Sequence, residues 1–219
     1  MYRVTAAVSL KAIAENALSI KKYSHKKLIA VVKDDAYGHG AAAVAHALEG
    51  IADAFAVASV EEGAALRTAG IARDILVLSP CMSAEEGVRL IGYNLIASIT
   101  SSAAFNVLKK AEDIAGMRVR AHLAVNTGMN RYGVRPALVA HMCALAGDRI
   151  EGVYTHLYAP EDNRSLSEQV RLFRAAADTV KGYFPDAVSH IAATGGAVRG
   201  AGGDAVRVGL ALYGYAPAT

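Results

Sequence analysis

Lys33 is the residue of this sequence whose setting points most directly to chemistry. It follows the apolar, β-branched run Leu28-Ile-Ala-Val-Val32, a pattern that predicts a buried strand over residues 28–33. An amine at the end of a buried strand is half sheltered from water, which favours the neutral, nucleophilic form that makes Schiff bases. The alternative is a lysine that only extends its charge from the strand end into water.

Four further groups of polar residues and glycines lie at the ends of apolar, strand-like runs. They are Asn126-Thr-Gly-Met-Asn-Arg131, Thr155-His156, Ala193-Thr194-Gly195-Gly196 and Arg207-Val-Gly209-Leu210. A glycine-rich turn with a hydroxyl at the start of a short helix offers amide and hydroxyl donors to a phosphate. Taken singly, each group has an ordinary structural explanation. His156 could be a core histidine, Arg131 and Arg207 could be ion-paired arginines at the surface or rim, and Thr194-Gly-Gly could be a simple turn. Their recurrence at several strand ends favours a shared site.

The elements that would position these residues alternate along the whole chain. Helical periodicity covers residues 9–23, 40–49, 60–70, 84–91, 101–115, 136–146 and 165–183. The predicted strands are residues 28–33, 54–58, 75–78, 95–99, 118–125, 150–156, 188–192 and 205–208. Eight strands alternating with helices predict an α/β fold of the (β/α)8 TIM-barrel type, in which working residues collect at the C-terminal ends of the strands. A doubly wound open sheet is the alternative, because the pattern alone does not close a barrel.

Composition describes an ordinary globular chain. Its 219 residues are 53% hydrophobic and 20% charged, with a mean hydropathy of +0.27, and we expect a single domain over residues 1–219. The net charge of +3 is too small to indicate nucleic-acid binding. No apolar run reaches the roughly 18–20 residues of a membrane span, and the N-terminus lacks a signal-peptide pattern, so we expect a cytoplasmic protein. Two isolated cysteines and seven scattered histidines show no metal-ligand spacing, and no metal is expected.

The segment Lys33-Asp-Asp-Ala-Tyr37-Gly-His-Gly40 resembles the pyridoxal-phosphate attachment motif of alanine racemases, K-x-N/D-A-Y-G-H-G. Further similarity extends from about Tyr2 to Pro217. It includes Asn126-Thr-Gly-Met-Asn-Arg131, similar to D-T-G-M-x-R, and Val206-Arg207-Val-Gly209-Leu210-Ala-Leu-Tyr-Gly214, similar to V-R-P/F-G-I-A-L-Y-G. In that family the motif lysine carries pyridoxal 5′-phosphate as an internal aldimine.

The resemblance implies a role for each matching residue. Lys33 would bind the cofactor and move the Cα proton of the substrate. The cofactor-binding residues would be Lys33, Tyr37, Arg131, His156, Thr194, Arg207, Gly209 and Leu210. Among these, Tyr37, Thr194 and the amides near Gly209 and Leu210 would hold the phosphate. Arg131 would bond near the phenolic oxygen, His156 would pack on the pyridine ring, and Arg207 would face the ring nitrogen. His39, His190 and the Asp34-Asp35 pair are interpreted as structural.

Four residues depart from the family pattern. Ala193-Thr194 stands where the family has an Asn-Ser pair, Asn126 where it has an aspartate, and Asp34 where a small residue is usual. The family also continues into a β-rich C-terminal domain that supplies a catalytic tyrosine across a dimer interface, whereas this sequence ends at Thr219 as the barrel closes. We identify no base for the second face of the substrate.

The sequence therefore predicts a pyridoxal-phosphate-dependent racemase acting on a small amino acid, with alanine first and serine second. Serine ranks second because serine racemases of the vancomycin-resistance type share these motifs. The expected partner is a second copy of the chain or a separate C-terminal domain. The alternative is a cofactor-binding module, or half of a split racemase, that does not turn over alone. A barrel similar to the pyridoxal-phosphate homeostasis proteins ranks lower, because those proteins lack the A-Y-G-H-G segment.

Overall fold

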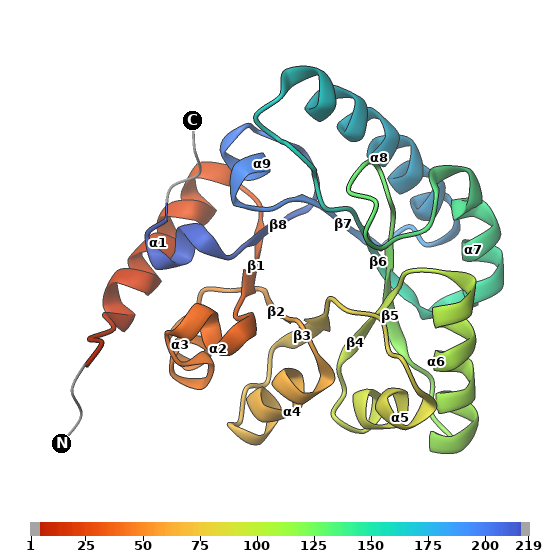
Figure 1. Ribbon diagram of the computed structural model, residues 1–219, viewed down its shortest axis with the longest axis horizontal. Coiled ribbons are helices and arrows are strands. Elements are labelled where there is room, and N and C mark those ends of the chain that lie inside the picture. Colours follow the sequence, from red (N-terminus) through yellow and green to blue (C-terminus); the bar gives the residue numbers. More distant parts are fainter. Residues whose placement is uncertain (1–4, 216–219) are drawn as a thin grey trace.

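The computed structural model describes residues 5–215, which form a closed barrel of eight parallel strands with helices around it (Figure 1). The strands pair in chain order, and β8 closes the barrel by pairing with β1. They are β1 (Lys27–Val31), β2 (Ala54–Val57), β3 (Asp74–Val77), β4 (Ile96–Ile99), β5 (Arg120–Ala124), β6 (Ile150–Tyr154), β7 (Val188–Ala192) and β8 (Ala205–Val208). The (β/α)8 barrel is confirmed, and the closure excludes an open, doubly wound sheet.

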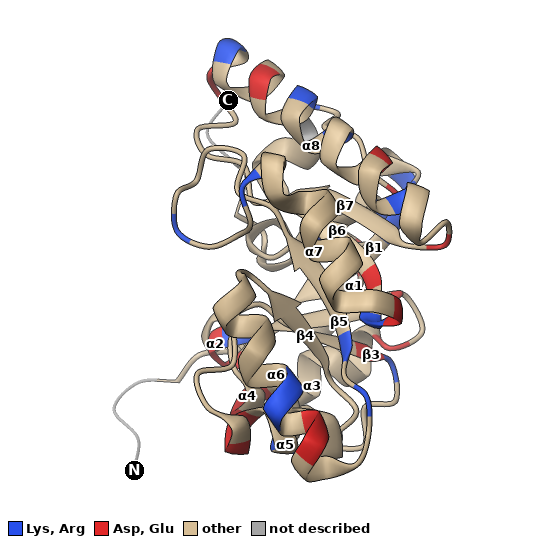
Figure 2. Cartoon of the chain, turned by 90° about the vertical axis from the view of Figure 1, so that its right-hand side faces the viewer, with Lys and Arg blue, Asp and Glu red and all other residues tan. Residues whose placement is uncertain are grey.

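Helices follow the strands and cover the outside of the barrel (Figure 1). They are α1 (Leu10–Ser24), α2 (Lys33–Gly38), α3 (Ala41–Leu48), α4 (Val60–Thr68), α5 (Ala84–Gly92), α6 (Ser102–Ala115), α7 (Val139–Ala146), α8 (Asn163–Tyr183) and α9 (Thr194–Val198). Short 3-10 turns lie at η1 (Pro136–Leu138), η2 (Gly147–Arg149) and η3 (Leu210–Tyr213). Serine N-caps begin α1, α4, α5 and α6, where each hydroxyl accepts a hydrogen bond from the amide three residues on. Most charged residues lie on the outer helices and loops (Figure 2).

The barrel interior is divided into an apolar half and a polar half. Side chains of β1 to β4 form a small apolar cluster that includes Ile29, Ala56, Leu76 and Ile96. The neighbouring positions along these strands belong to the larger core cluster, as the alternation of side chains across a strand requires. By the same alternation, β5 to β8 direct polar residues inward: His122, Tyr154, His190 and Arg207, all of which are buried. The polar half is the part of the interior that leads to the candidate site.

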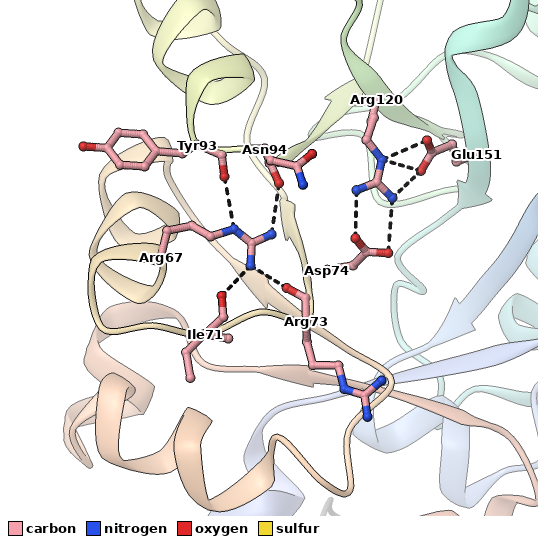
Figure 3. A network of polar contacts seen from close by, with 8 residues as sticks. All are labelled: Arg67, Ile71, Arg73, Asp74, Tyr93, Asn94, Arg120 and Glu151. Carbon is pink, nitrogen blue, oxygen red and sulfur yellow. Dashed lines mark hydrogen bonds and ion pairs between the residues drawn. The ribbon is translucent and has the colours of Figure 1, made fainter.

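An ion-pair network lies at the N-terminal ends of the strands (Figure 3). Arg120 of β5 donates to both carboxylate oxygens of Asp74 on β3 and of Glu151 on β6. These bonds raise the pKa of Arg120 above its usual value and join three strands at the end of the barrel away from the cavity. Nearby, Arg67 of α4 donates to four backbone carbonyls, those of Ile71, Arg73, Tyr93 and Asn94.

The predicted element boundaries are wrong in two places that affect the site. The first strand ends at Val31, and Lys33 is the first residue of α2 rather than the last residue of the strand. After Lys33 the chain enters a left-handed turn, in which Asp34 to Tyr37 have φ values between 51° and 56°. Residues other than glycine disfavour this region by about 1–2 kcal/mol each, so sequence propensity gives no sign of the turn. β6 likewise ends at Tyr154, before Thr155 and His156.

Other boundaries differ by one to three residues, which is the usual scatter at element ends. The helix predicted from Pro136 begins as the η1 turn and becomes α-helical at Val139. Within residues 5–215, none of the helices combines the length and apolar character needed to cross a bilayer.

Candidate functional site

A cavity of about 630 Å³ opens at the C-terminal ends of the strands. Seven of the eight residues predicted for the site line it: Lys33, Tyr37, Arg131, His156, Thr194, Arg207 and Leu210. The eighth, Gly209, is not among the lining residues, and it lies against the hydroxyl of Tyr37. Residues that follow five different strands therefore meet around one space.

Lys33 reaches this cavity from the start of α2. Its side chain is 35% exposed, and Nζ lies 3.2 Å from Oδ2 of Asp34 and 5.8 Å from the ring centroid of Tyr37. Burial raises the pKa of Tyr37, an effect that the Lys33 charge opposes and the Asp34 carboxylate reinforces. The amine is thus accessible from the cavity and held between a carboxylate and an aromatic ring.

Tyr37 is held in place by residues near the end of the described chain. Its ring packs on Tyr213 at a centroid distance of 5.2 Å, and Tyr213 in turn stacks on His39 at 4.6 Å. The Tyr213 hydroxyl donates to the carbonyl of Val31 at 3.0 Å. A Cβ atom built on Gly209 would lie 2.5 Å from Oη of Tyr37, so only glycine leaves room for this hydroxyl. The Tyr37 hydroxyl and Gly209, both predicted to hold the phosphate, therefore lie next to each other.

Thr194 reaches the same segment from β7. It is buried at the start of α9, and its Oγ1 accepts a hydrogen bond from the amide of Ala211 at 3.4 Å. Tyr37 and Thr194 therefore both lie against residues 209–211, although they follow strands on either side of β8. Hydroxyl and amide donors of three chain segments are close together here, an arrangement suited to a phosphate group.

Arg207 is the buried cation of the site. It is 3% exposed, and its Nη1 donates to Nδ1 of His190 at 2.9 Å and to the His190 carbonyl at 3.0 Å. Nη2 donates to the Thr155 carbonyl at 2.8 Å and makes a longer contact of 3.4 Å with Nδ1 of His156. The guanidinium carbon lies 5.0 Å from the ring centroid of Tyr154. Burial lowers the pKa of Arg207 to about 10, so the side chain stays charged at neutral pH.

A chain of hydrogen bonds runs from Arg207 to His190 and then to His122, both of which are buried. Because Nδ1 of His190 accepts from Arg207, the hydrogen of neutral His190 is on Nε2, which lies 2.8 Å from Nδ1 of His122. His122 therefore accepts at Nδ1. Burial lowers the pKa of both rings, to about 4 for His122 and well below the usual value for His190. Both are neutral at pH 7.

Sequence reasoning missed this relay, since His190 was interpreted as a structural residue and His122 was not singled out. The available signal was the position of the two histidines within their strands. Each is the central residue of a five-residue strand and faces the barrel interior, as Tyr154 does on β6. Gly152 of β6 pairs with His122 and leaves space for its ring, because an added Cβ would lie 2.8 Å from the imidazole.

Arg131 and His156 lie at the mouth of the cavity, where both are exposed. The loop that carries Arg131 is ordered by Asn126, whose Oδ1 accepts the amides of Gly128 and Asn130 at 3.1 Å. The pKa of His156 lies below its usual value because the ring is partly desolvated and the cations of Arg207 and Arg131 are near.

Comparison with known proteins supplies the family. The family model described as "Alanine racemase, N-terminal domain" matches residues 8–217. The chain belongs to this family. It is 34% identical to the alanine racemase of Aquifex pyrophilus over 221 residues, covering 99% of this chain and 60% of that protein. It is also 34% identical to the alanine racemase of Cutibacterium acnes over 233 residues, with coverages of 97% and 60%.

Solved structures agree with the sequence comparison. The crystal structure of alanine racemase from D-cycloserine-producing Streptomyces lavendulae superposes with a TM-score of 0.85 at 28% identity, covering 95% of this chain and 58% of that one. Alanine racemase from Corynebacterium glutamicum gives a TM-score of 0.83 at 27% identity, covering 100% and 65%. The chain thus spans about 60% of the length of the relatives it matches. The family depends on pyridoxal 5′-phosphate.

Proposed function

We propose that this chain is the cofactor-binding barrel of a pyridoxal-phosphate-dependent alanine racemase. The observation that carries the proposal is the set of donors around one cavity: an accessible amine on Lys33, clustered hydroxyl and amide donors near Gly209, and a buried guanidinium on Arg207. These three groups complement the aldehyde, the phosphate and the ring nitrogen of the cofactor. Membership of the family supports the same choice of cofactor.

Lys33 would hold the cofactor through Nζ and, once released, exchange a proton with Cα of the substrate. When bound, pyridoxal phosphate withdraws electrons from Cα of an attached amino acid and so acidifies its proton. Lys33 then acts as the general base on one face of Cα. The hydroxyls of Tyr37 and Thr194, together with the amides of Gly209 and Leu210, would bind the phosphate.

Arg207 would orient the ring nitrogen from below the cavity. Its three shortest bonds leave one Nη2 hydrogen engaged only by the long contact to His156, so this hydrogen is available to an acceptor in the cavity. A guanidinium donates a hydrogen bond without surrendering its proton at neutral pH. Arg207 thereby limits the movement of negative charge into the ring and favours return of the proton to Cα. Arg131 and His156 would contact the ring from the mouth.

Alanine is the proposed substrate and serine the second choice. Racemisation by two bases needs a proton donor on each face of Cα, and Lys33 serves one of them. Because the 219 residues span about 60% of the length of their relatives, we propose that the second donor comes from polypeptide outside these residues. The second candidate function is therefore a cofactor-binding half that exchanges protons without inverting its substrate.

Proton exchange at Cα in heavy water tests the proposal. Each enantiomer of alanine and serine is incubated with the chain and pyridoxal phosphate, and NMR follows the loss of the Cα proton. Exchange with inversion is the result expected of a racemase, and exchange with retention is the result expected of the cofactor-binding half. Absence of exchange in a chain shown to hold the cofactor would overturn proton transfer by Lys33 and would favour a cofactor-binding module without turnover of its own.

Chemical trapping tests the assignment of Lys33 separately. Sodium borohydride fixes the cofactor irreversibly to an amine, and peptide mass spectrometry then locates it. We expect the adduct on Lys33, with none formed in the Lys33→Ala variant. An unchanged yield of adduct in Lys33→Ala would contradict the assignment.

A further inference from the structure

Glu62 links two βα units beside the candidate lysine. It lies in the first turn of α4, where its Oε2 accepts a hydrogen bond from the amide of Ala58 at 2.7 Å. Its other oxygen, Oε1, accepts from the amide of Asp34, also at 2.7 Å. The Asp34 amide belongs to the peptide bond that immediately follows Lys33. One carboxylate therefore connects the loop after β2 to the backbone of the residue proposed to hold the cofactor.

Comparison with Glu86 in the next βα unit separates the helix-capping bond of Glu62 from its additional bond to Asp34. Ser59 and Glu62 form a capping pair, since the amide of Glu62 donates to the Ser59 hydroxyl at 3.3 Å. Ser83 and Glu86 repeat this pair in α5, with the Glu86 amide 3.2 Å from the Ser83 hydroxyl and Oε2 of Glu86 accepting from Met82 at 2.8 Å. Within residues 5–215, Glu86 accepts no bond from another βα unit. The contact to Asp34 is thus additional to helix capping.

The Asp34 amide is placed where the backbone needs support. Asp34 is the first of four consecutive non-glycine residues with positive φ, a conformation that L-residues adopt only when their surroundings impose it. The far end of the turn is held by Asp35, whose carbonyl accepts from Gly40 at 2.9 Å and whose Oδ1 accepts from Ala41 at 2.7 Å. At the near end, Glu62 holds the amide next to Lys33.

We infer that Glu62 is a positioning residue for Lys33. By fixing the Asp34 amide, it sets the direction in which the chain leaves Lys33 and keeps the left-handed turn from relaxing. The Lys33 side chain then projects into the cavity beside Tyr37. This inference rests on the proposed role of Lys33. One measurement below tests the effect of Glu62 on the backbone after Lys33, and a second tests its effect on the reaction of Lys33 with the cofactor.

The first measurement is amide hydrogen exchange of residues 33–38, followed by peptide mass spectrometry on the cofactor-free chain. Glu62→Ala is expected to accelerate exchange in this segment at least about tenfold, because exchange reports local opening. Glu62→Gln retains one acceptor oxygen and should fall between Glu62→Ala and the unchanged protein. Glu86→Ala is the matched control, since it removes the same capping bond in α5 and should leave residues 33–38 unchanged.

The second measurement is the rate of borohydride-trapped adduct formation on Lys33 with pyridoxal phosphate. We expect Glu62→Ala to slow it and Glu86→Ala to leave it unchanged. Equal exchange in Glu62→Ala and Glu86→Ala, with both variants folded by circular dichroism, would overturn the inference. If Lys33→Ala still traps the cofactor, the proposed function fails, whereas the exchange result continues to test the contact between Glu62 and Asp34.

Discussion

Acidification from pH 8 to pH 5 is expected to destabilise this barrel through the buried pair His122 and His190. Above pH 6.5 both rings are neutral in the folded and the unfolded chain, so they leave stability unchanged. Between pH 6.5 and pH 4 the unfolded chain binds protons that the folded chain excludes, because burial lowers the pKa of both rings. Stability is therefore complete above pH 6.5 and is lost as the pH falls through this window.

The size of the effect follows from the pKa of His122. With a folded pKa of about 4 and an unfolded pKa of about 6.5, this ring alone lowers the free energy of unfolding by about 2 kcal/mol at pH 5. His190 adds to the loss in the same direction. Carboxylates with lowered pKa, such as Asp74 and Asp204, act mainly below pH 5 because their unfolded values are near 4. The window from pH 6.5 to 5 thus reports on the histidines.

Urea denaturation followed by circular dichroism at pH 8, 6.5 and 5 measures this effect. In His122→Asn, the amide oxygen can take the position of Nδ1 and still accept from His190. We expect the loss of stability between pH 8 and pH 5 to shrink by about 2 kcal/mol in this variant. His141→Asn, at an exposed position of α7, is the control and should retain the full loss. An equal loss in His122→Asn and the unchanged protein would refute the reasoning.

Two further variants test the site and the scaffold. Gly209→Ala places a Cβ 2.5 Å from Oη of Tyr37 and should displace this hydroxyl. In equilibrium titrations we expect the variant to bind pyridoxal phosphate about tenfold more weakly and to bind pyridoxal unchanged. An equal loss of affinity for both ligands would count against phosphate binding at this position. Glu112→Ala leaves the largely buried Arg149 without its two 2.7 Å bonds and should cost about 3 kcal/mol in urea denaturation. Glu112→Ala combined with Arg149→Met should recover part of that cost, and no recovery would speak against the unpaired charge as its cause.

Local patterns were sufficient to predict most of the fold. Apolar β-branched runs and serine caps mark the elements, because burial and unsatisfied helix amides impose the same requirements wherever they occur. The left-handed turn after Lys33 was not predictable in this way. Aspartate adopts positive φ mostly as a single residue, and Ala36 and Tyr37 rarely adopt it, so a run of four such residues is not indicated by local propensity. Distant partners such as Glu62 hold the turn in place. The strand boundary at Val31 was misplaced for the same reason.

The sequence by itself determined the family, the order of elements and the residue types at the C-terminal ends of the strands. These features are local, since motifs and periodicity are carried by neighbouring residues. Tertiary structure alone decided which distant residues meet. The pairing of β5, β6 and β7 brings His190 within 2.8 Å of His122, which is 68 positions earlier. Barrel closure by β8 and β1 places Arg207 between the strands that follow and precede it in the barrel. The physical reason is that contacts across a parallel barrel depend on register and strand order, which no short segment encodes.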